Sequence, residues 1–353
     1  MMKIDLASLI PETTSNGYRI DMIKNKTHVT LSYKCKFSRP ESLMIKRFVN
    51  LDELFFEGFG LIEGDGDKVK FVAFTNSEFA ILNHFLDFME RCFDVSREVF
   101  RVRLFLPVCA DPEHAKNKVI GSLRIKESQL SGFDFRSNHR SMVVNLYKRT
   151  VLLDIVFRKL YEFSRKMARQ NKVYAIPYLR GVIAAEGTVQ RRNTTRSVFA
   201  VKISSIKPDN TNLYKNLLKL CNLEFGKNER DCIPIRHLRN FAKMESYELL
   251  RVSEAKNKKF TEGLKILKAK KGKMLDCGVT KGRIIKILNS KGPMTIPELL
   301  REIRKTRKTQ DRPSLYDHVW DLEKQDEVKR VGTKTVQRPY HQIIVWSIAN
   351  PSE

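Results

Sequence analysis

Two acidic residues, Asp65 and Glu186, stand in matching surroundings, each directly before a glycine at the end of an apolar run. If each run is a helix, each carboxylate lies in the last turn, where the negative end of the helix dipole disfavours it by about 0.3–1 kcal/mol. Two carboxylates brought together there also repel each other and raise one another's pKa. We therefore expect a cation between them, and Mg²⁺, or another divalent cation such as Mn²⁺, suits oxygen ligands.

The two runs that must position these acids share a pattern of small residues. The first, FFEGFGLIEGDGD, spans Phe55–Asp67, and the second, YLRGVIAAEGT, spans Tyr178–Thr188. Each carries two small residues four positions apart, which lie on one face of a helix and let a second helix approach closely. The small pairs are Gly60 with Gly64 and Gly181 with Ala185. The pattern predicts two helices that pack on each other and bring both acids to one end.

The residues that flank the two helices suggest where they begin and end. Asn50 is a candidate N-cap for the first helix, because an Asn side chain can accept a hydrogen bond from a free backbone amide. Gly66 and Gly187 suit the left-handed conformation that commonly ends a helix. This conformation would place Asp65 and Glu186 in the last helical turns.

At these residues the sequence resembles the LAGLIDADG homing endonucleases. The nine-residue motif is matched by GFGLIEGDG (Gly58–Gly66) and by LRGVIAAEG (Leu179–Gly187), and its eighth, metal-binding position falls on Asp65 and Glu186. Gly58 replaces the leading leucine of the first copy, and Ala184 replaces the sixth-position acid of the second. The resemblance implies a monomeric, two-motif enzyme in which each half hydrolyses one strand of a DNA duplex with the help of divalent ions.

The order of predicted elements divides the chain into five segments. Helices and strands recur around each motif, which predicts an α+β fold with two pseudo-symmetric αββαββα-type repeats and saddle-shaped antiparallel sheets. Three helices and a basic hairpin at the C-terminus resemble a winged helix-turn-helix domain. The expected segments are an N-terminal extension at 1–50, the two repeats at 51–170 and 171–255, a basic linker or linker helix at 256–279, and the winged helix at 280–353.

Further residues are candidates for orienting a water molecule beside the acids. The family resemblance implies basic or polar side chains at strand ends, and Lys148 is the foremost candidate in the first half. Asn76 and Ser205 are weaker candidates at the ends of the strands that follow each motif, and Arg236 stands where a lysine is expected in the second half. The alternative for all four is an ordinary solvated or phosphate-contacting side chain.

Basic side chains on the predicted sheets and in the winged helix are candidates for contacting DNA. Arg101 and Arg103 share one face of a strand, and Arg196 and Lys202 flank or occupy a strand of the second repeat. By the winged-helix resemblance, Tyr316 and His318 lie near the leading end of the helix that enters the major groove. Lys334 and Arg338 would then touch phosphate from the wing, although winged helices also serve as protein-docking modules.

The overall composition points to a polyanionic partner. The 353 residues include 66 Lys and Arg against 40 Asp and Glu, a formal net charge of +26. No apolar run reaches the roughly 18 residues of a membrane span, and the N-terminus lacks the features of a signal peptide. Six cysteines show no Cys-x-x-Cys spacing, which favours reduced thiols and a cytoplasmic protein without a membrane partner.

Two functions remain open on this sequence. The first is a site-specific, metal-dependent endodeoxyribonuclease acting as a monomer on double-stranded DNA, of the kind associated with intron or intein mobility. The alternative is a non-cleaving transcriptional regulator or an RNA-splicing maturase on the same scaffold, with intron RNA as a further partner. We favour the nuclease because both eighth-position acids are present, and a purely structural scaffold has no need of them.

Overall fold

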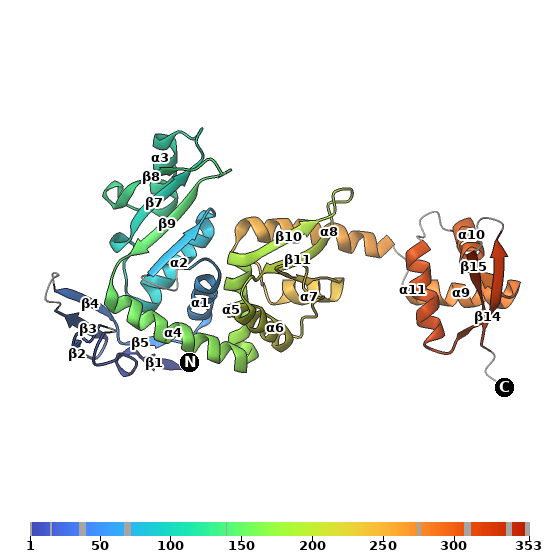
Figure 1. Ribbon diagram of the computed structural model, residues 1–353, viewed down its shortest axis with the longest axis horizontal. Coiled ribbons are helices and arrows are strands. Elements are labelled where there is room, and N and C mark those ends of the chain that lie inside the picture. The colour runs from blue at the N-terminus through green and yellow to red at the C-terminus, as the bar shows by residue number, and fades with distance from the viewer. Residues whose placement is uncertain are drawn as a thin grey trace. The chain divides into compact units, whose positions relative to one another are not determined.

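The computed structural model describes residues 2–14, 16–34, 40–66, 72–138, 140–273, 277–306, 312–336 and 341–349. The chain forms two compact units, Met1–Leu267 and Lys268–Glu353 (Figure 1). Both units combine helices with small, largely antiparallel sheets, so the predicted α+β class is confirmed. Within the described residues, no helix is both long and apolar enough to cross a membrane.

The first fifty residues form two small sheets. Their elements are β1 (Lys3–Asp5), the 3-10 helix η1 (Leu6–Ser8), β2 (Asp21–Lys24), β3 (His28–Tyr33), β4 (Glu41–Lys46) and β5 (Phe48–Asn50). β1 pairs with β5, and β2, β3 and β4 form an antiparallel sheet in that order. Val29 and Leu31 of β3 are fully buried in the same hydrophobic core as the helices that follow. This segment is therefore part of the core of the first unit.

The first repeat is built around a four-stranded sheet. Its elements are α1 (Glu53–Asp65), β6 (Val72–Asn76), α2 (Phe79–Phe93), the 3-10 helix η2 (Arg97–Val99), β7 (Arg101–Leu106), α3 (Pro112–Leu123), the 3-10 helix η3 (Glu127–Gln129), β8 (Leu130–Phe135), β9 (Val143–Lys148) and α4 (Val151–Gln170). The strand order is β6-β9-β7-β8. β7 and β8 are parallel, unlike the antiparallel sheet predicted, because α3 and η3 form a crossover that returns the chain in its original direction.

The second repeat is shorter. Its elements are α5 (Lys172–Glu186), β10 (Gly187–Arg191), β11 (Val198–Ser204), α6 (Pro208–Leu220), β12 (Cys232–Ile235), α7 (Leu238–Ser246) and α8 (Glu254–Lys273). β10, β11 and β12 form an antiparallel sheet in that order. Phe260 and Leu264 of α8 are buried, and the Phe260 ring meets the edge of Phe241 with ring centroids 5.9 Å apart. The first part of α8, expected as a linker, thus packs in the core.

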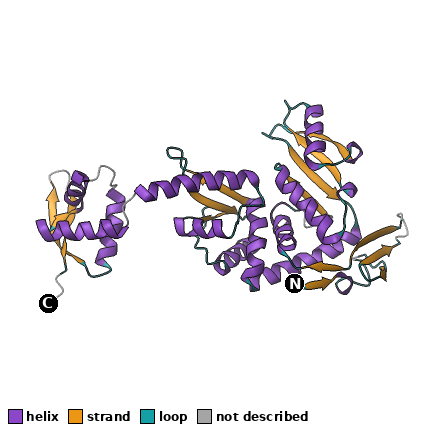
Figure 2. Ribbon diagram, turned by 180° about the vertical axis from the view of Figure 1, so that it is seen from behind, coloured by secondary structure: helices purple, strands orange, loops and turns teal. Residues whose placement is uncertain are grey.

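The two motif helices, α1 and α5, lie against each other as the small residues predicted (Figures 1 and 2). A Cβ atom built on Gly60 would stand 2.1 Å from the carbonyl oxygen of Tyr178, and one on Gly181 would stand 2.1 Å from that of Glu57. The helix backbones are therefore in direct contact. Gly58, which replaces the leading leucine of the motif, leaves the room that the Phe88 ring fills, 2.2 Å from the position of a Cβ.

The ends of the motif helices differ from the prediction. Asp52, and not Asn50, caps α1, and its side chain accepts a hydrogen bond from the amide of Phe55 at 3.0 Å. Gly66 and Gly187 have φ angles of −81° and −77°, so neither is left-handed. The chain instead runs straight from each helix into extended structure. Both positions still require glycine, because a Cβ would stand within 2.7 Å of a carbonyl oxygen one turn earlier.

The second unit has its own core and the order of elements of a winged helix. Its elements are α9 (Cys277–Lys291), β13 (Met294–Thr295), α10 (Ile296–Thr306), α11 (Arg312–Glu323), β14 (Val328–Val336) and β15 (His341–Ile348). The strands form one sheet in the order β13-β15-β14. Trp346 is fully buried among leucine, isoleucine and valine side chains from the three helices and β14.

Candidate functional site

Asp65 and Glu186 end the two packed helices and form what we call the acid pair. Each is the last residue of its helix, α1 or α5. A Cβ built on Gly64 would lie 2.9 Å from the Cγ atom of Glu186, so the two helix ends adjoin. The structure therefore places both acids at one end of the helix pair.

The carboxyl group of Asp65 is partly buried and hydrogen-bonded. The Nδ2 of Asn76, at the end of β6, donates to its Oδ2 at 2.6 Å. Burial raises the pKa of Asp65, and the hydrogen bond from Asn76 and the charge of Lys256 act in the opposite direction. Asn76, a weaker candidate in the sequence, is thus in direct contact with an acid of the pair.

Lys256, near the start of α8, supplies the cation at this end of the helix pair. Its Nζ donates to the carbonyl oxygens of Ile183 and Ala185, each at 3.2 Å, and to that of Ala184. These are among the last carbonyls of α5. The Ile183 carbonyl also accepts from the amide of Gly187, and Lys256 adds a donor at this helix end. Burial lowers the pKa of Lys256, while the charges of Asp65, Glu78 and Glu186 act to raise it.

Hydrogen bonds through Glu78 fix the start of α8 and so position Lys256. The Oε2 of Glu78 accepts from the hydroxyl of Ser253 at 2.7 Å, and its Oε1 accepts from the amide of Ala255 at 3.1 Å. The amide of Glu78 in turn donates to the Oδ1 of Asn76 at 2.8 Å. A continuous chain of hydrogen bonds therefore links the Asp65 carboxylate to the beginning of α8.

Sequence reasoning missed Lys256 because it lies in a lysine-rich run that resembles a solvated linker. Its partners are backbone carbonyls about 70 residues earlier in the chain. Every residue has a backbone carbonyl, so residue types do not show which carbonyls bind a lysine. The available signal was Ser253, three residues before Lys256, a residue type that commonly caps a helix start.

The residues at the acid pair fit a divalent cation poorly. A lysine ammonium already satisfies the end of α5, and a second positive charge beside it would be repelled. Within the part of the chain that the structure describes, no group of three His, Cys, Asp or Glu side chains is arranged to hold a metal ion. The ammonium of Lys256 therefore offsets part of the carboxylate charge that a metal ion would otherwise neutralise.

Lys148, the foremost candidate for orienting water, lies away from the acid pair. In the pairing of β6 with β9, Lys148 is opposite Val72, whereas Asn76 is opposite Val144. Four residues along a strand separate the two positions by about 13 Å. Lys148 instead lines a cavity of about 670 Å³ together with Tyr33 and Glu41 of the N-terminal segment. Strand register, which a single sequence does not specify, decides this placement.

The two remaining water-orienting candidates have different surroundings. Ser205 lines a cavity of about 350 Å³ that Glu186 and Tyr214 also line, and its hydroxyl lies 2.8 Å from that of Thr211. Arg236 forms an ion pair with Glu229 and is not among the residues that line this cavity. Of these two, only Ser205 shares a cavity with an acid of the pair.

The predicted DNA-contacting residues of the first unit lie on exposed strand faces or turns. Arg101 and Arg103 are exposed and alternate along β7 with fully buried neighbours, and the Arg103 guanidinium is 3.0 Å from Asp134. Lys202 on β11 forms an ion pair with Glu229 at 2.7 Å. Arg196 is exposed in the turn between β10 and β11, with a φ of 55°.

In the second unit, Tyr316 and His318 lie on α11. The sequence predicted both residues near the leading end of a recognition helix. The Tyr316 ring meets that of Trp320 at 6.5 Å between centroids, and Trp320 is 51% exposed. Lys334 on β14 forms an ion pair with Glu298 on α10 at 2.9 Å. Arg338 lies outside the described residues.

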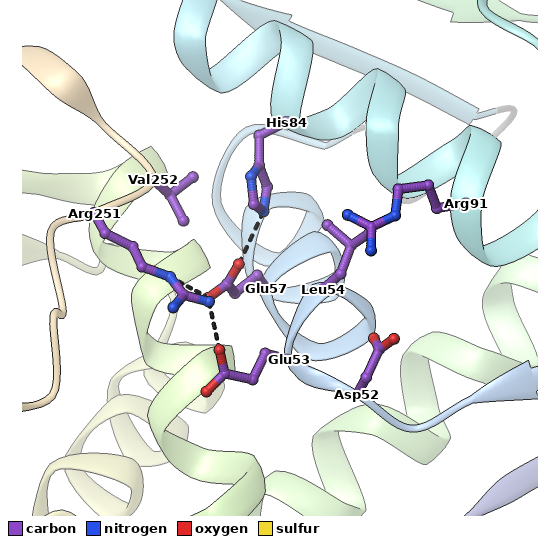
Figure 3. Close-up of a pocket in the computed structure, with 8 residues that line it drawn as sticks. All are labelled: Asp52, Glu53, Leu54, Glu57, His84, Arg91, Arg251 and Val252. Carbon is purple, nitrogen blue, oxygen red and sulfur yellow. Dashed lines mark hydrogen bonds and ion pairs between the residues drawn. The ribbon is translucent and has the colours of Figure 1, made fainter. Parts of the chain in front are cut away.

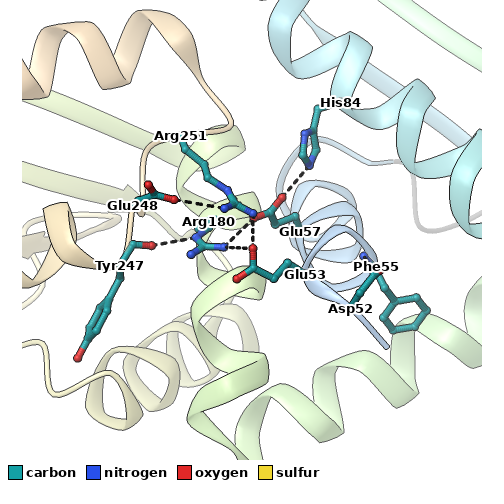
Figure 4. A network of polar contacts seen from close by, with 9 residues as sticks. All are labelled: Asp52, Glu53, Phe55, Glu57, His84, Arg180, Tyr247, Glu248 and Arg251. Atoms are coloured by element: carbon teal, nitrogen blue, oxygen red, sulfur yellow. Dashed lines mark hydrogen bonds and ion pairs between the residues drawn. The ribbon is translucent and has the colours of Figure 1, made fainter. Parts of the chain in front are cut away.

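A buried ionic cluster that the sequence did not reveal joins the two repeats (Figure 4). Glu57 of α1 is almost fully buried, and its Oε1 accepts from Arg180 of α5 at 3.0 Å and from Arg251 at 2.6 Å. Its Oε2 lies 3.1 Å from the Nε2 of His84. Burial would raise the pKa of Glu57, but these partners hold it below the usual value. Glu57, His84 and Arg251 of this cluster line a cavity of about 530 Å³, in which His84 and Arg251 point at Glu57 (Figure 3).

The acid at the sixth motif position, Glu63, is also buried. Its Oε2 accepts from the hydroxyls of Tyr161 and Tyr178, each at 2.8 Å, and lies 3.2 Å from the Nε of Arg165. The second repeat has Ala184 at the equivalent position, so this cluster has no counterpart there. Glu57 and Glu63 thus both serve to hold α1 against its neighbours.

Comparisons with known proteins find similar solved structures, of which two are described here. One is the crystal structure of the N-terminal LAGLIDADG domain of DUF199/WhiA, with 14% identity and a TM-score of 0.35 over 58% of this chain and 86% of that chain. The other is full-length DUF199/WhiA from Thermatoga maritima, with 13% identity and a TM-score of 0.36 over 78% of this chain and 91% of that chain. No family model and no curated protein matches. Identities and TM-scores this low carry no argument about the fold. The description of the fold therefore rests on this structure itself, above all on the packing of α1 against α5.

Proposed function

We propose that this protein binds double-stranded DNA and does not cut it, with the exposed faces of the β6-β9-β7-β8 and β10-β11-β12 sheets as the contact surfaces. The net charge of +26 favours a polyanion. Arg101 and Arg103 on β7, and Lys202 on β11, project from the faces opposite the buried core side chains of the same strands. One chain supplies both halves of the surface, so we infer that a monomer is the binding species.

The single observation that carries the non-cleaving function is the position of Lys256. Hydrolysis of a phosphodiester near neutral pH calls for divalent ions that neutralise the transferring group and activate a water molecule. At the acid pair, the last carbonyls of α5 already bind an ammonium, which the charges of Asp65 and Glu186 also favour. This arrangement gives both acids a role that needs no metal, because their charges favour the ammonium of the half-buried Lys256.

The test is to measure DNA binding and DNA cleavage in the same samples. Fluorescence anisotropy with a labelled random duplex pool gives the affinity in EDTA and in Mg²⁺ or Mn²⁺, and sequencing of strand ends reveals any cut. We expect equal affinity in both buffers, after allowing for ionic strength, and no new ends. The variants D65N and E186Q should then bind DNA like the parent protein.

A metal-dependent nuclease is the second candidate, favoured by one observation. The two eighth-position acids adjoin, and Glu186 lines a cavity of about 350 Å³ that could admit a ligand. Mg²⁺ or Mn²⁺ would then be the cofactor, and Lys256 would have to leave the α5 carbonyls. New strand ends that appear with Mg²⁺ and disappear in both D65N and E186Q would establish this function and overturn the first.

A further inference from the structure

Phe199 on β11 is an exposed aromatic side chain surrounded by arginines. It is 40% exposed, and the guanidinium carbons of Arg236 and Arg192 lie 5.2 and 5.5 Å from its ring centroid. The register of β10 with β11 shifts between Gln190 and Arg191, so Phe199 is an extra residue with no partner on β10. A bulge of this kind commonly re-aims a side chain, often beside a functional site.

The two arginines at this ring are held differently. Arg236 forms an ion pair with Glu229, which Lys202 also contacts at 2.7 Å. Arg192 is exposed and forms no ion pair with any described residue. A planar ligand can therefore take the place of Arg192 on the ring while Arg236 stays fixed, and the displaced guanidinium is then free to meet a phosphate.

The first repeat carries a similar arrangement on its own sheet. Phe105 follows Arg101 and Arg103 on the exposed face of β7, and the Arg136 guanidinium carbon lies 4.1 Å from its ring centroid. Tyr147 of β9 is opposite Arg101, with Arg149 at 5.5 Å from its ring centroid. Aromatic rings with arginines beside them thus occur on both sheets that we propose to face DNA.

Aromatic rings of this kind suit the flat face of a base more than its edge. In an intact duplex the base faces are stacked on each other and only the edges reach the grooves. Proteins that bind unpaired bases stack them on aromatic rings and on guanidinium planes, beside basic groups that contact the backbone. Both groups are present at Phe199.

We propose that Phe199 stacks on an unpaired base, so that the preferred ligand is a nucleic acid with a bulged or single-stranded nucleotide. This inference rests on the proposed function, because it needs the same sheet to face nucleic acid. Arg236 supports the ring from within the protein, and Lys202 and Arg192 contact the flanking phosphates. Unpaired bases occur in both DNA and RNA, and the stacking chemistry is the same in each.

The experiment compares an intact duplex with the same duplex carrying one bulged nucleotide, in DNA and in RNA, by fluorescence anisotropy with the full chain. The test variants are F199A and F199W. The matched control is F48A, because Phe48 on β5 is 41% exposed and also has an arginine, Arg47, 4.8 Å from its ring centroid. Circular dichroism of each variant verifies folding.

We expect the parent protein to prefer the bulged ligand in DNA, in RNA or in both. F199A should lose about tenfold in affinity for that ligand, a loss typical of one stacked base, and less than about twofold for the intact duplex. F48A should change neither affinity. F199W should keep the preference, and the fluorescence of the added tryptophan should fall when the bulged ligand binds but not when the intact duplex binds.

Two results would overturn the inference and can be told apart. If F199A weakens intact and bulged ligands equally, or weakens neither, Phe199 does not stack on a base, while the proposed DNA binding stands. If the parent protein binds none of the four ligands, the proposed function fails together with the inference.

Discussion

At the scale of single residues, Lys256 changes what Asp65 and Glu186 can do. The acids alone suggest a metal site, but an ammonium bound to three carbonyls of α5 gives them a partner from the protein itself. Burial raises the pKa of Asp65 and lowers that of Lys256. Each charged group therefore loses hydration on folding, and the nearby opposite charges stabilise its charged form.

Replacing Lys256 by Met should destabilise the first unit by about 1–3 kcal/mol, because buried carbonyls at the end of α5 lose their donor. Urea unfolding followed by circular dichroism measures the change. K258M is the control, since Lys258 is an exposed lysine two positions along the same helix. Equal stability of the two variants would show that the ammonium of Lys256 has no structural role.

Glu298 gives a pH-dependent prediction in the second unit. It accepts hydrogen bonds from the amide and hydroxyl of Thr295, each at 2.8 Å, and pairs with Lys334, so its pKa falls to about 2. A carboxyl whose folded pKa is depressed adds stability above its usual pKa and loses it as the pH falls through the folded pKa. This contribution is therefore complete above about pH 4.5 and is lost between there and pH 2.

E298Q should remove about 1–2 kcal/mol at pH 7 and make the second unit less sensitive to acid between pH 4.5 and 2. Tryptophan fluorescence during urea unfolding measures this unit alone, because both tryptophans of the chain, Trp320 and Trp346, lie within it. If parent and variant lose stability in parallel as the pH falls, Glu298 is not the titrating group.

At the scale of elements, the contact between α1 and α5 holds the two repeats together. Glycines let the backbones touch, and the ionic cluster around Glu57 closes one side of the same contact. Replacing a buried ion pair by apolar residues is often neutral, whereas removing one partner is costly. We therefore expect the close backbone contact at the glycines to contribute more to the packing of α1 on α5 than the ion pairs of Glu57 do.

Gly60→Val should cost about 3 kcal/mol or more, because its Cβ would stand 2.1 Å from a backbone oxygen that cannot move alone. Gly121→Ala on α3 is the control, since nothing lies within 4 Å of the added Cβ. It should stabilise the helix by about 0.5–1 kcal/mol. Thermal unfolding of both variants checks the pair, and similar melting temperatures would contradict the close packing of α1 on α5.

At the scale of the whole molecule, the sequence predicted the α+β class and the helix pair because both follow from local periodicity and small-residue spacing. The sequence did not predict the features that depend on contacts between residues far apart in the chain. The register of β6 with β9 takes Lys148 away from the acids, and the fold brings Lys256 to carbonyls about 70 residues earlier. The straight exits at Gly66 and Gly187 depend on the strands that follow, which the helix pattern does not describe.

The net charge of +26 gives a prediction for the whole molecule in solution. A protein that neutralises six or more phosphates loses about a thousandfold in DNA affinity between 50 and 200 mM salt. We expect a loss of at least about a hundredfold for this chain, measured by anisotropy over that range. R196M should make the dependence on salt shallower by about one counterion, while K24M, on β2 of the N-terminal sheet, should not.

Titration with Mn²⁺, followed by electron paramagnetic resonance of the free ion, tests most directly whether Lys256 takes the place of a metal at the acid pair. We predict that the parent protein and D65N bind the same amount of Mn²⁺, because no ion occupies this site. One equivalent of Mn²⁺ bound by the parent protein and lost in D65N would contradict that prediction and return the acid pair to metal chemistry.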